Sequence, residues 1–391
     1  MDPGRPGGER GVRPGMTTGG ALSRAAGRRV GAVLASVLLG GAVLAACGGA
    51  ASGAGSAGSA GSAGIARVAW VANESFQSDP GDTITPVDLP GGTVGSPVAT
   101  ASEPVAMATT DGGRELVVAN RGNDTLTVVR TASGSVAATA TVGMEPDAVA
   151  VAPGGPKDAG VALVADFGAD EVTPVDLGTM RAGRPIPVGK EPDALAVLPA
   201  AGAQPALALV ADFGADAVTP IDLATMAPGV PIPVGQEPDA LAVDPGASRR
   251  SGSTAGTLVL VADFGNDGVT PISVPELDAG AFIPTPGNPT GIAVAPDGTA
   301  WVAGGGTLAP LAPGAPEASG AAGAGSGPPV LSLGHAITLP GVAESVALDG
   351  STTAWVALER GAVVPVDLAS GHVGRAVAVG GRPADIVVTP G

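Results

Sequence analysis

Short apolar runs separated by turn residues recur along the chain after residue 64. In the clearest unit, four such runs follow one another, at 209–211, 218–223, 230–234 and 237–243. They are bounded by Gly, Pro, Asp and Asn, the residues that favour turns. No segment of this region keeps a helical apolar period for three turns. The pattern therefore predicts repeated units of four short strands.

The unit returns along the chain. Residues 163–170 read LVADFGAD, and near copies stand at 209–216 and 260–267, while weaker copies keep an apolar-Val-Ala triplet at 70–72, 117–119, 301–303 and 355–357. A period of 40 to 50 residues built from short strands is typical of a β-propeller. We predict an all-β fold, a seven-bladed propeller of four-stranded blades over residues 65–391. Its repeats start near 65, 114, 161, 206, 257, 299 and 353.

One copy carries a resemblance to a known family. Residues 118–129 and 141–153 read VANRGNDTLTVV and TVGMEPDAVAVAP. They resemble the YVTN family of β-propeller repeats, and the likeness extends over nearly all of residues 65–391. The resemblance implies that the P-x-x-V-A-V strand is innermost and the Val-Ala strand second. The terminal run 384–389 would then supply the inner strand of the blade that 67–73 begins, closing the ring.

The chain departs from the family pattern by placing proline inside the predicted third strands. Proline cannot donate a ladder hydrogen bond, so each position predicts a bulge or a non-bonded site. These prolines are Pro86, Pro174, Pro220, Pro271, Pro310 and Pro365. A further departure is a Gly-, Ala-, Ser- and Pro-rich insertion at 313–329, for which we predict a disordered loop.

The N-terminal region predicts export. Three arginines precede an uncharged stretch at 30–46, the arrangement of a secretory signal peptide. The residues Leu44-Ala-Ala-Cys47 resemble the bacterial lipobox, which implies an acylated Cys47 as the first mature residue. We predict an N-terminal extension and signal peptide over 1–46, then the lipidated cysteine and a flexible tether over 47–64. A membrane-spanning helix is the alternative, and Sec or Tat export and a start at Met1 or Met16 stay open.

This signal predicts a protein anchored by lipid to the outer face of the cytoplasmic membrane, at the cell surface or in the periplasm. The composition limits the classes of partner and cofactor that the protein can bind. The formal charge is −17, and the chain from Cys47 onward has 13 basic against 34 acidic residues with no basic stripe. Nucleic acid is therefore excluded as a partner. Cys47 is the single cysteine of the sequence, which excludes disulfides and thiolate metal or iron–sulfur sites.

Acidic residues gather on one predicted face, because strand direction puts the loop entering the inner strand and the turn after the second strand at the same end of the blade. One interpretation is that they close turns through hydrogen bonds to the backbone. The other is a face that binds a cation or a cationic ligand. Ca²⁺ would be the best-suited metal, and no other cofactor is expected. The candidates are Glu145, Asp147, Glu191, Asp193, Glu237 and Asp239 near the mouth of the ring, with Asp166, Asp212 and Asp263 further out.

Catalytic arrangements that need histidine are not supported. His335 falls before an outermost strand and His372 in a turn on the opposite face. Propeller lactonases and streptogramin lyases share this architecture, and the lyases rely on a histidine near the channel. We therefore favour a non-enzymatic, monomeric binding module for a protein or cationic ligand. The alternative is a hydrolase or lactonase-like enzyme with a metal held by carboxylates. The recurring Phe167, Phe213 and Phe264 are interpreted as packing between blades.

Overall fold

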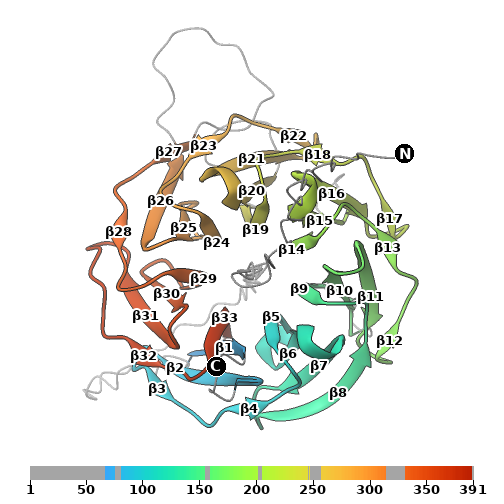
Figure 1. Ribbon diagram of the computed structural model, residues 1–391, viewed down its shortest axis with the longest axis horizontal. Coiled ribbons are helices and arrows are strands. Elements are labelled where there is room, and N and C mark those ends of the chain that lie inside the picture. The colour runs from blue at the N-terminus through green and yellow to red at the C-terminus, as the bar shows by residue number, and fades with distance from the viewer. Residues whose placement is uncertain are drawn as a thin grey trace, which may run out of the picture.

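The body of the protein is a ring of seven antiparallel sheets (Figure 1). The computed structural model describes residues 67–74, 81–154, 159–200, 205–244, 246, 257–313 and 331–389. The predicted all-β, seven-bladed propeller with four-stranded blades is confirmed. Cys47, the signal peptide, the tether and nearly all of the 313–329 insertion lie outside the described residues. Within those residues, no helix has the length and apolar character needed to cross a membrane.

Each blade runs from the ring axis outward as an inner, second, third and outer strand. The inner strands of blades 1 to 7 are β33 (Arg382–Thr389), β5 (Pro104–Thr110), β9 (Pro146–Ala152), β14 (Pro192–Leu198), β19 (Pro238–Asp244), β24 (Pro289–Val294) and β29 (Ala343–Asp349). The second strands are β1 (Arg67–Glu74), β6 (Glu115–Asn120), β10 (Val161–Asp166), β15 (Leu207–Asp212), β20 (Thr257–Asp263), β25 (Ala300–Gly304) and β30 (Thr353–Leu358).

The third strands, in the same blade order, are β2 (Thr83–Leu89), β7 (Thr125–Arg130), β11 (Glu171–Asp176), β16 (Ala217–Asp222), β21 (Gly268–Val274), β26 (Thr307–Pro313) and β31 (Ala362–Asp367). The outer positions hold β3 (Thr93–Val94) with β4 (Val98–Ala99), β8 (Ser135–Thr141), β12 (Arg181–Ala182) with β13 (Ile186–Pro187), β17 (Ala227–Pro228) with β18 (Ile232–Pro233), β22 (Asp278–Ala279) with β23 (Ile283–Pro284), β27 (Leu331–Leu333) with β28 (Ile337–Thr338), and β32 (Val377–Ala378). Short 3-10 turns are η1 (Asp111–Gly113), η2 (Arg121–Asn123), η3 (Phe213–Ala215) and η4 (Phe264–Asn266).

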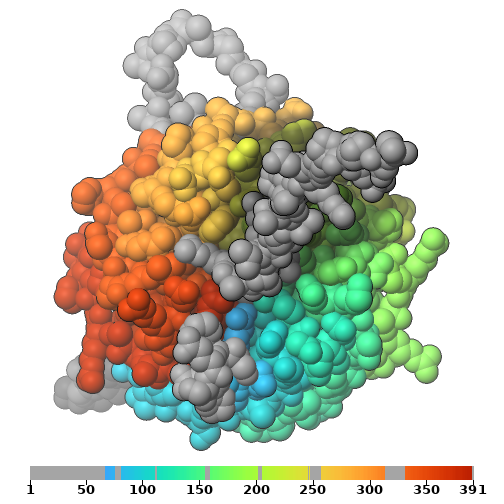
Figure 2. Space-filling model, viewed as in Figure 1, coloured from blue at the N-terminus to red at the C-terminus, as the bar shows by residue number. Residues whose placement is uncertain are grey.

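Blade 1 joins the two ends of the described chain. The C-terminal strand β33 pairs antiparallel with β1, with Val68 opposite Thr389 and Val71 opposite Ile386. In the space-filling view, the red C-terminal strand lies directly beside the blue N-terminal one (Figure 2). The predicted closure of the ring by residues 384–389 is confirmed. Since closure leaves no unpaired edge at β1, it protects the body against edge-to-edge association.

The six third-strand prolines fit the fold through a break in the outer strand. Pro174 lies opposite Leu163 of β10 without any shift in register. Its carbonyl accepts the N–H of Gly183 at 2.7 Å. The N and C=O of one strand residue point to the same side, so the missing N–H faces the gap between β12 and β13. The same carbonyl-to-glycine bond occurs at all six prolines. Blade 2, which has Val128 at this position, keeps a single outer strand β8, whose pairing with β7 shifts register between Val128 and Val129. The non-bonded site is therefore the correct alternative.

The core lies within and between the blades and consists mainly of aliphatic side chains. The largest fully buried ones include Leu163, Leu195 and Leu209 of blades 3 and 4. Trp70, Trp301 and Trp355 are 7% exposed or less. These tryptophans pack within the body, as their place in the apolar-Val-Ala triplet indicates.

Candidate functional site

The inner strands share a bulge at the end where they begin. In each blade the register with the second strand skips one residue near the start of the inner strand, the second residue of that strand in blades 2 to 7 and the third in blade 1. A bulge turns a side chain out of the regular ladder and often lies next to a functional site. We call these seven residues the bulge ring, and the face on which they lie the loop face. In blade order they are Ala384, Val105, Asp147, Asp193, Asp239, Thr290 and Glu344, all buried.

The bulge ring brings together three of the predicted site residues. Asp147, Asp193 and Asp239 occupy it in three consecutive blades. The charges of Glu344 and Asp147, each two blades away, raise the pKa of Asp239. These carboxyl groups therefore lie close enough to interact across the ring axis. The carboxyl groups therefore converge on the axis of the propeller.

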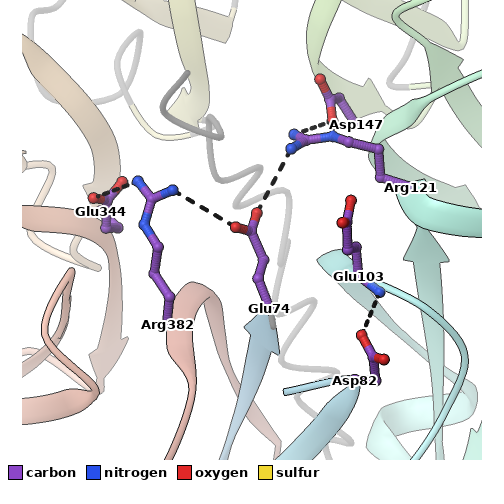
Figure 3. A network of polar contacts seen from close by, with 7 residues as sticks. All are labelled: Glu74, Asp82, Glu103, Arg121, Asp147, Glu344 and Arg382. Atoms are coloured by element: carbon purple, nitrogen blue, oxygen red, sulfur yellow. Dashed lines mark hydrogen bonds and ion pairs between the residues drawn. The ribbon is translucent and has the colours of Figure 1, made fainter. Parts of the chain in front are cut away.

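Half of the ring carries a network of alternating charges that repeat-based reasoning missed (Figure 3). Glu74, at the end of β1, stands between two arginines. Its carboxylate lies 3.6 Å from Arg382 and 3.7 Å from Arg121. Arg382 continues to Glu344 at 3.1 Å, and Arg121 pairs with Asp147. The network thus spans blades 7, 1, 2 and 3. In it, each buried carboxylate lies beside a buried arginine of opposite charge.

Glu74 and the two arginines of this network break the repeat at their positions. Arg121 stands where Phe167, Phe213 and Phe264 stand in other blades, directly after the second strand. Arg382 takes the place of the glutamate that precedes proline in the Glu-Pro-Asp loops. Burial raises the pKa of Glu74, and the two arginines partly offset that effect. The sequence signal for this network was therefore the set of residues that depart from the repeat, not the repeated residues.

The other half of the ring holds a carboxyl pair. Burial raises the pKa of Asp239 well above its ordinary value, and the neighbouring Asp193 raises it further. Apart from the carboxyl of Asp193, no described residue supplies a hydrogen-bond donor to Asp239. Two adjacent buried carboxyls cannot both ionise cheaply, so the pair shares a proton. A positively charged group is the other means of stabilising it.

The outer acids hold the turns together. Asp166, Asp212 and Asp263 are fully buried at the ends of the second strands. Each accepts a hydrogen bond from the threonine seven residues on, at 2.5 to 2.6 Å, the threonines being Thr173, Thr219 and Thr270. The glycine that begins each neighbouring loop also leaves no room for a side chain beside the carboxylate. These contacts agree with the turn-closing interpretation of the three aspartates.

Glu145, Glu191 and Glu237 are exposed on the loop face. All three have φ near +50°. Their N–H groups donate to Asp124, Asp170 and Asp216 of the preceding blade at 2.8 to 2.9 Å. This bond fixes each loop against the previous blade, so it positions the bulge residue two places later.

The buried outer aspartates predict a pH-dependent stability. Burial raises the pKa of Asp166 to about 7, that of Asp212 to about 6 and that of Asp263 to about 7. Between pH 4 and these values the folded state binds protons that the unfolded state has lost, so stability falls as pH rises. The triple variant Asp166→Asn, Asp212→Asn, Asp263→Asn should lose less stability than wild type between pH 5 and 8, as measured by thermal melts.

Blades 1 and 2 already contain the substitution that this experiment makes. Asn73 and Asn120 occupy the equivalent places and donate to Thr85 and Thr127 at 2.9 and 3.0 Å. The asparagine variant should therefore fold, and Asp297→Asn, at an exposed turn, serves as the control for removing a carboxylate. Parallel pH profiles for wild type and the triple variant would contradict the assignment.

The two histidines lie away from the bulge ring. His335 is exposed between β27 and β28, and His372 is exposed in the turn before β32. Across the described ranges, no group of three or more His, Cys, Asp and Glu side chains is arranged to hold a metal ion. The polar side chains that the described residues place at the ring carry carboxyl, guanidinium and hydroxyl groups.

Comparison with known proteins supports the fold. No family model matches the chain, and no curated protein matches it. Among solved structures it is similar to a functionally unknown protein from Desulfotomaculum acetoxidans, with TM-score 0.66, 16% identity, and coverage of 82% of this chain and 98% of that one. A candidate 6-phosphogluconolactonase from Bacteroides uniformis gives 0.63, 14%, 83% and 100%. Kuenenia stuttgartiensis hydrazine synthase gives 0.56, 17%, 73% and 90%. At these identities the likeness shows a shared fold alone.

Proposed function

We propose that this protein is an exported, lipid-anchored binding module whose bulge ring accepts a positively charged group of its ligand. The carboxyl of Asp239 carries this proposal. It is buried, it lies beside Asp193, and no described residue other than Asp193 offers it a hydrogen-bond donor. A buried carboxyl without a donor is costly unless a proton or a cation stabilises it.

The charge balance of the ring supports a cationic ligand. The network of three carboxylates and two arginines has a net charge of −1 when fully ionised. Asp193 and Asp239 add two further carboxyls to the same ring. A cation bound at this pair takes the place of the shared proton, so both carboxyls can ionise without adding net negative charge to the ring. An anionic ligand would meet the excess negative charge instead.

The direction of β1 supports an arrangement in which the membrane tether leaves the loop face accessible to a ligand. The strand β1 runs from Arg67 to Glu74, and Glu74 belongs to the network on the loop face. Arg67 pairs with Asp349 at the opposite end of an inner strand. A tether over 48–64 from an acylated Cys47 would therefore enter the body at the face opposite the bulge ring. The lipobox, the tether and the YVTN-type repeats are the sequence features behind this part of the proposal.

A cation panel tests the proposal on the full-length chain. We expect spermidine or another organic ammonium at pH 7.5 to raise the melting temperature by about 3 °C at ten times its dissociation constant. The same panel includes Ca²⁺, Mg²⁺, Mn²⁺ and EDTA. The variant Asp239→Asn should lose the shift, because it removes the charge and keeps the shape.

The control is Asp278→Asn, which removes one exposed carboxylate from the outer strand of blade 5. It should retain the full shift. Equal shifts in wild type and Asp239→Asn, or no shift with any cation, would refute a cation site at the ring.

A hydrolase that uses the same carboxyl pair is the second candidate. The raised pKa of Asp239 favours it, because a carboxyl whose pKa is raised by burial is suited to act as a general acid. The fold shared with a candidate 6-phosphogluconolactonase makes a lactone the first probe. Turnover of a lactone that disappears in Asp239→Asn separates this candidate from a pure binding module. Metal-dependent hydrolysis has less support, given the ligand groups described above.

A further inference from the structure

The boundary between blades 4 and 5 carries an aromatic pair as well as the carboxyl pair. The rings of Phe213 and Phe264 lie 6.5 Å apart between centroids, at 39° to one another. They begin η3 and η4 on the loop face. This contact agrees with the interpretation that these phenylalanines pack between blades, and it fixes the two rings as one unit.

The aromatic pair stands next to the carboxyl pair. The N–H of Phe213 donates to the carbonyl of Glu191, and that of Phe264 to the carbonyl of Glu237, both at 3.0 Å. Each glutamate precedes Asp193 or Asp239 by two residues, which is at most about 7 Å of chain. The carboxyls therefore lie toward the axis and the rings lie just outside them.

The aromatic pair and the carboxyl pair occur together on one side of the ring. Phe213 and Phe264 are partly exposed, whereas Phe167 of blade 3 is 5% exposed. The equivalent positions of blades 1, 2, 6 and 7 hold Glu74, Arg121, Gly305 and Glu359. In a seven-membered ring the boundary of blades 4 and 5 lies across from blade 1, the centre of the arginine network (Figure 1). The two sides of the loop face thus differ in chemistry.

We propose that the ligand of the bulge ring is a primary ammonium joined to an apolar group, an inference that rests on the proposed function. Its ammonium donates to the carboxyls of Asp193 and Asp239, and its apolar part lies on the rings of Phe213 and Phe264. A primary ammonium has three N–H donors, enough for two carboxyls. Aromatic faces attract both the apolar part and the charge beside it. An inorganic cation would use the carboxyls and leave the aromatic pair unused.

Two amines of equal charge test this assignment. Isothermal titration calorimetry on the full-length chain compares 2-phenylethylammonium with ethylammonium at pH 7.5. We expect wild type to bind the first about ten times more tightly. The double variant Phe213→Leu, Phe264→Leu keeps the apolar packing and removes the aromatic faces, so this ratio should fall to about two while ethylammonium binding stays unchanged. Asp239→Asn should lose both amines.

The control variant is Phe282→Leu, an exposed phenylalanine on the outer part of blade 5. It should keep the tenfold ratio. The single variants Phe213→Leu and Phe264→Leu, each checked by a thermal melt, replace the double variant if that one does not fold. An unchanged ratio in these variants, with binding still lost in Asp239→Asn, overturns the aromatic assignment and leaves the proposed function standing. If neither amine binds, this assignment is overturned, and the cation panel decides separately whether the proposed function stands.

Discussion

Removal of residues 382–391 should lower the melting temperature of the protein by about 15 °C or more. The deletion takes away β33, the inner strand of blade 1, and with it the seven register pairs to β1. Ile386 and Val387 are at most 1% exposed, and each buried aliphatic side chain contributes about 2 kcal/mol. The loss also exposes one edge of β1, which promotes association between molecules. Thermal melts followed by circular dichroism, with light scattering for association, measure both effects.

A shorter deletion is the control for this experiment. Removing residues 390–391, which follow β33, should leave the melting temperature within about 1 °C of wild type. The point variant Ile386→Ala should fall between the two deletions, because it removes buried apolar surface and keeps the strand. A ring closed by other contacts would show the same melting temperature for the long deletion as for wild type.

The fold was predictable because its information is repeated. The apolar-Val-Ala triplet marks the second strand of every blade, from 70–72 to 355–357, so errors in one copy are corrected by the others. The closing strand followed from the same reasoning, since a chain that begins on a second strand and ends on a first one must pair its ends. The third-strand prolines were the exception to strand propensity. Their explanation lies in the split outer strand, which propensity alone does not report.

The site was predictable in part. The repeat pattern identified its carboxylates but not the arginines that pair with them. Asp147, Asp193 and Asp239 recur as Glu-Pro-Asp and were therefore visible. Arg121 and Arg382 occur once each at positions where other blades carry different residues. The sequence does not indicate that Arg121 and Arg382 meet at Glu74, because that contact depends on side-chain packing between blades, which a repeat pattern does not describe. The positions that break the repeat are where a symmetric fold acquires asymmetric chemistry.

The same closure depends on one buried carboxyl group, and replacing Asp385 by alanine should cost about 3 to 9 kcal/mol. Its Oδ2 accepts the N–H of Met107 in blade 2 at 2.8 Å. Its Oδ1 accepts the hydroxyl of Ser345 in blade 7 at 3.0 Å and the N–H of Ile386 at 2.8 Å. Alanine would leave three buried donors without an acceptor across three blades, and each such donor costs about 1 to 3 kcal/mol. Chemical denaturation of both proteins measures the difference in free energy of unfolding.

The pH dependence of that difference identifies the carboxyl as its source. Burial raises the pKa of Asp385 to about 7. Below the unfolded-state pKa near 4 the contribution of this raised pKa is fully present, and it is lost as pH rises toward 7. The wild-type advantage over Asp385→Ala should therefore be larger at pH 5 than at pH 8. Ser345→Ala removes a single donor and should cost about 1 kcal/mol at both values. An advantage that grows with pH would mean that Asp385 is ionised in the folded protein and that its three donors outweigh its burial.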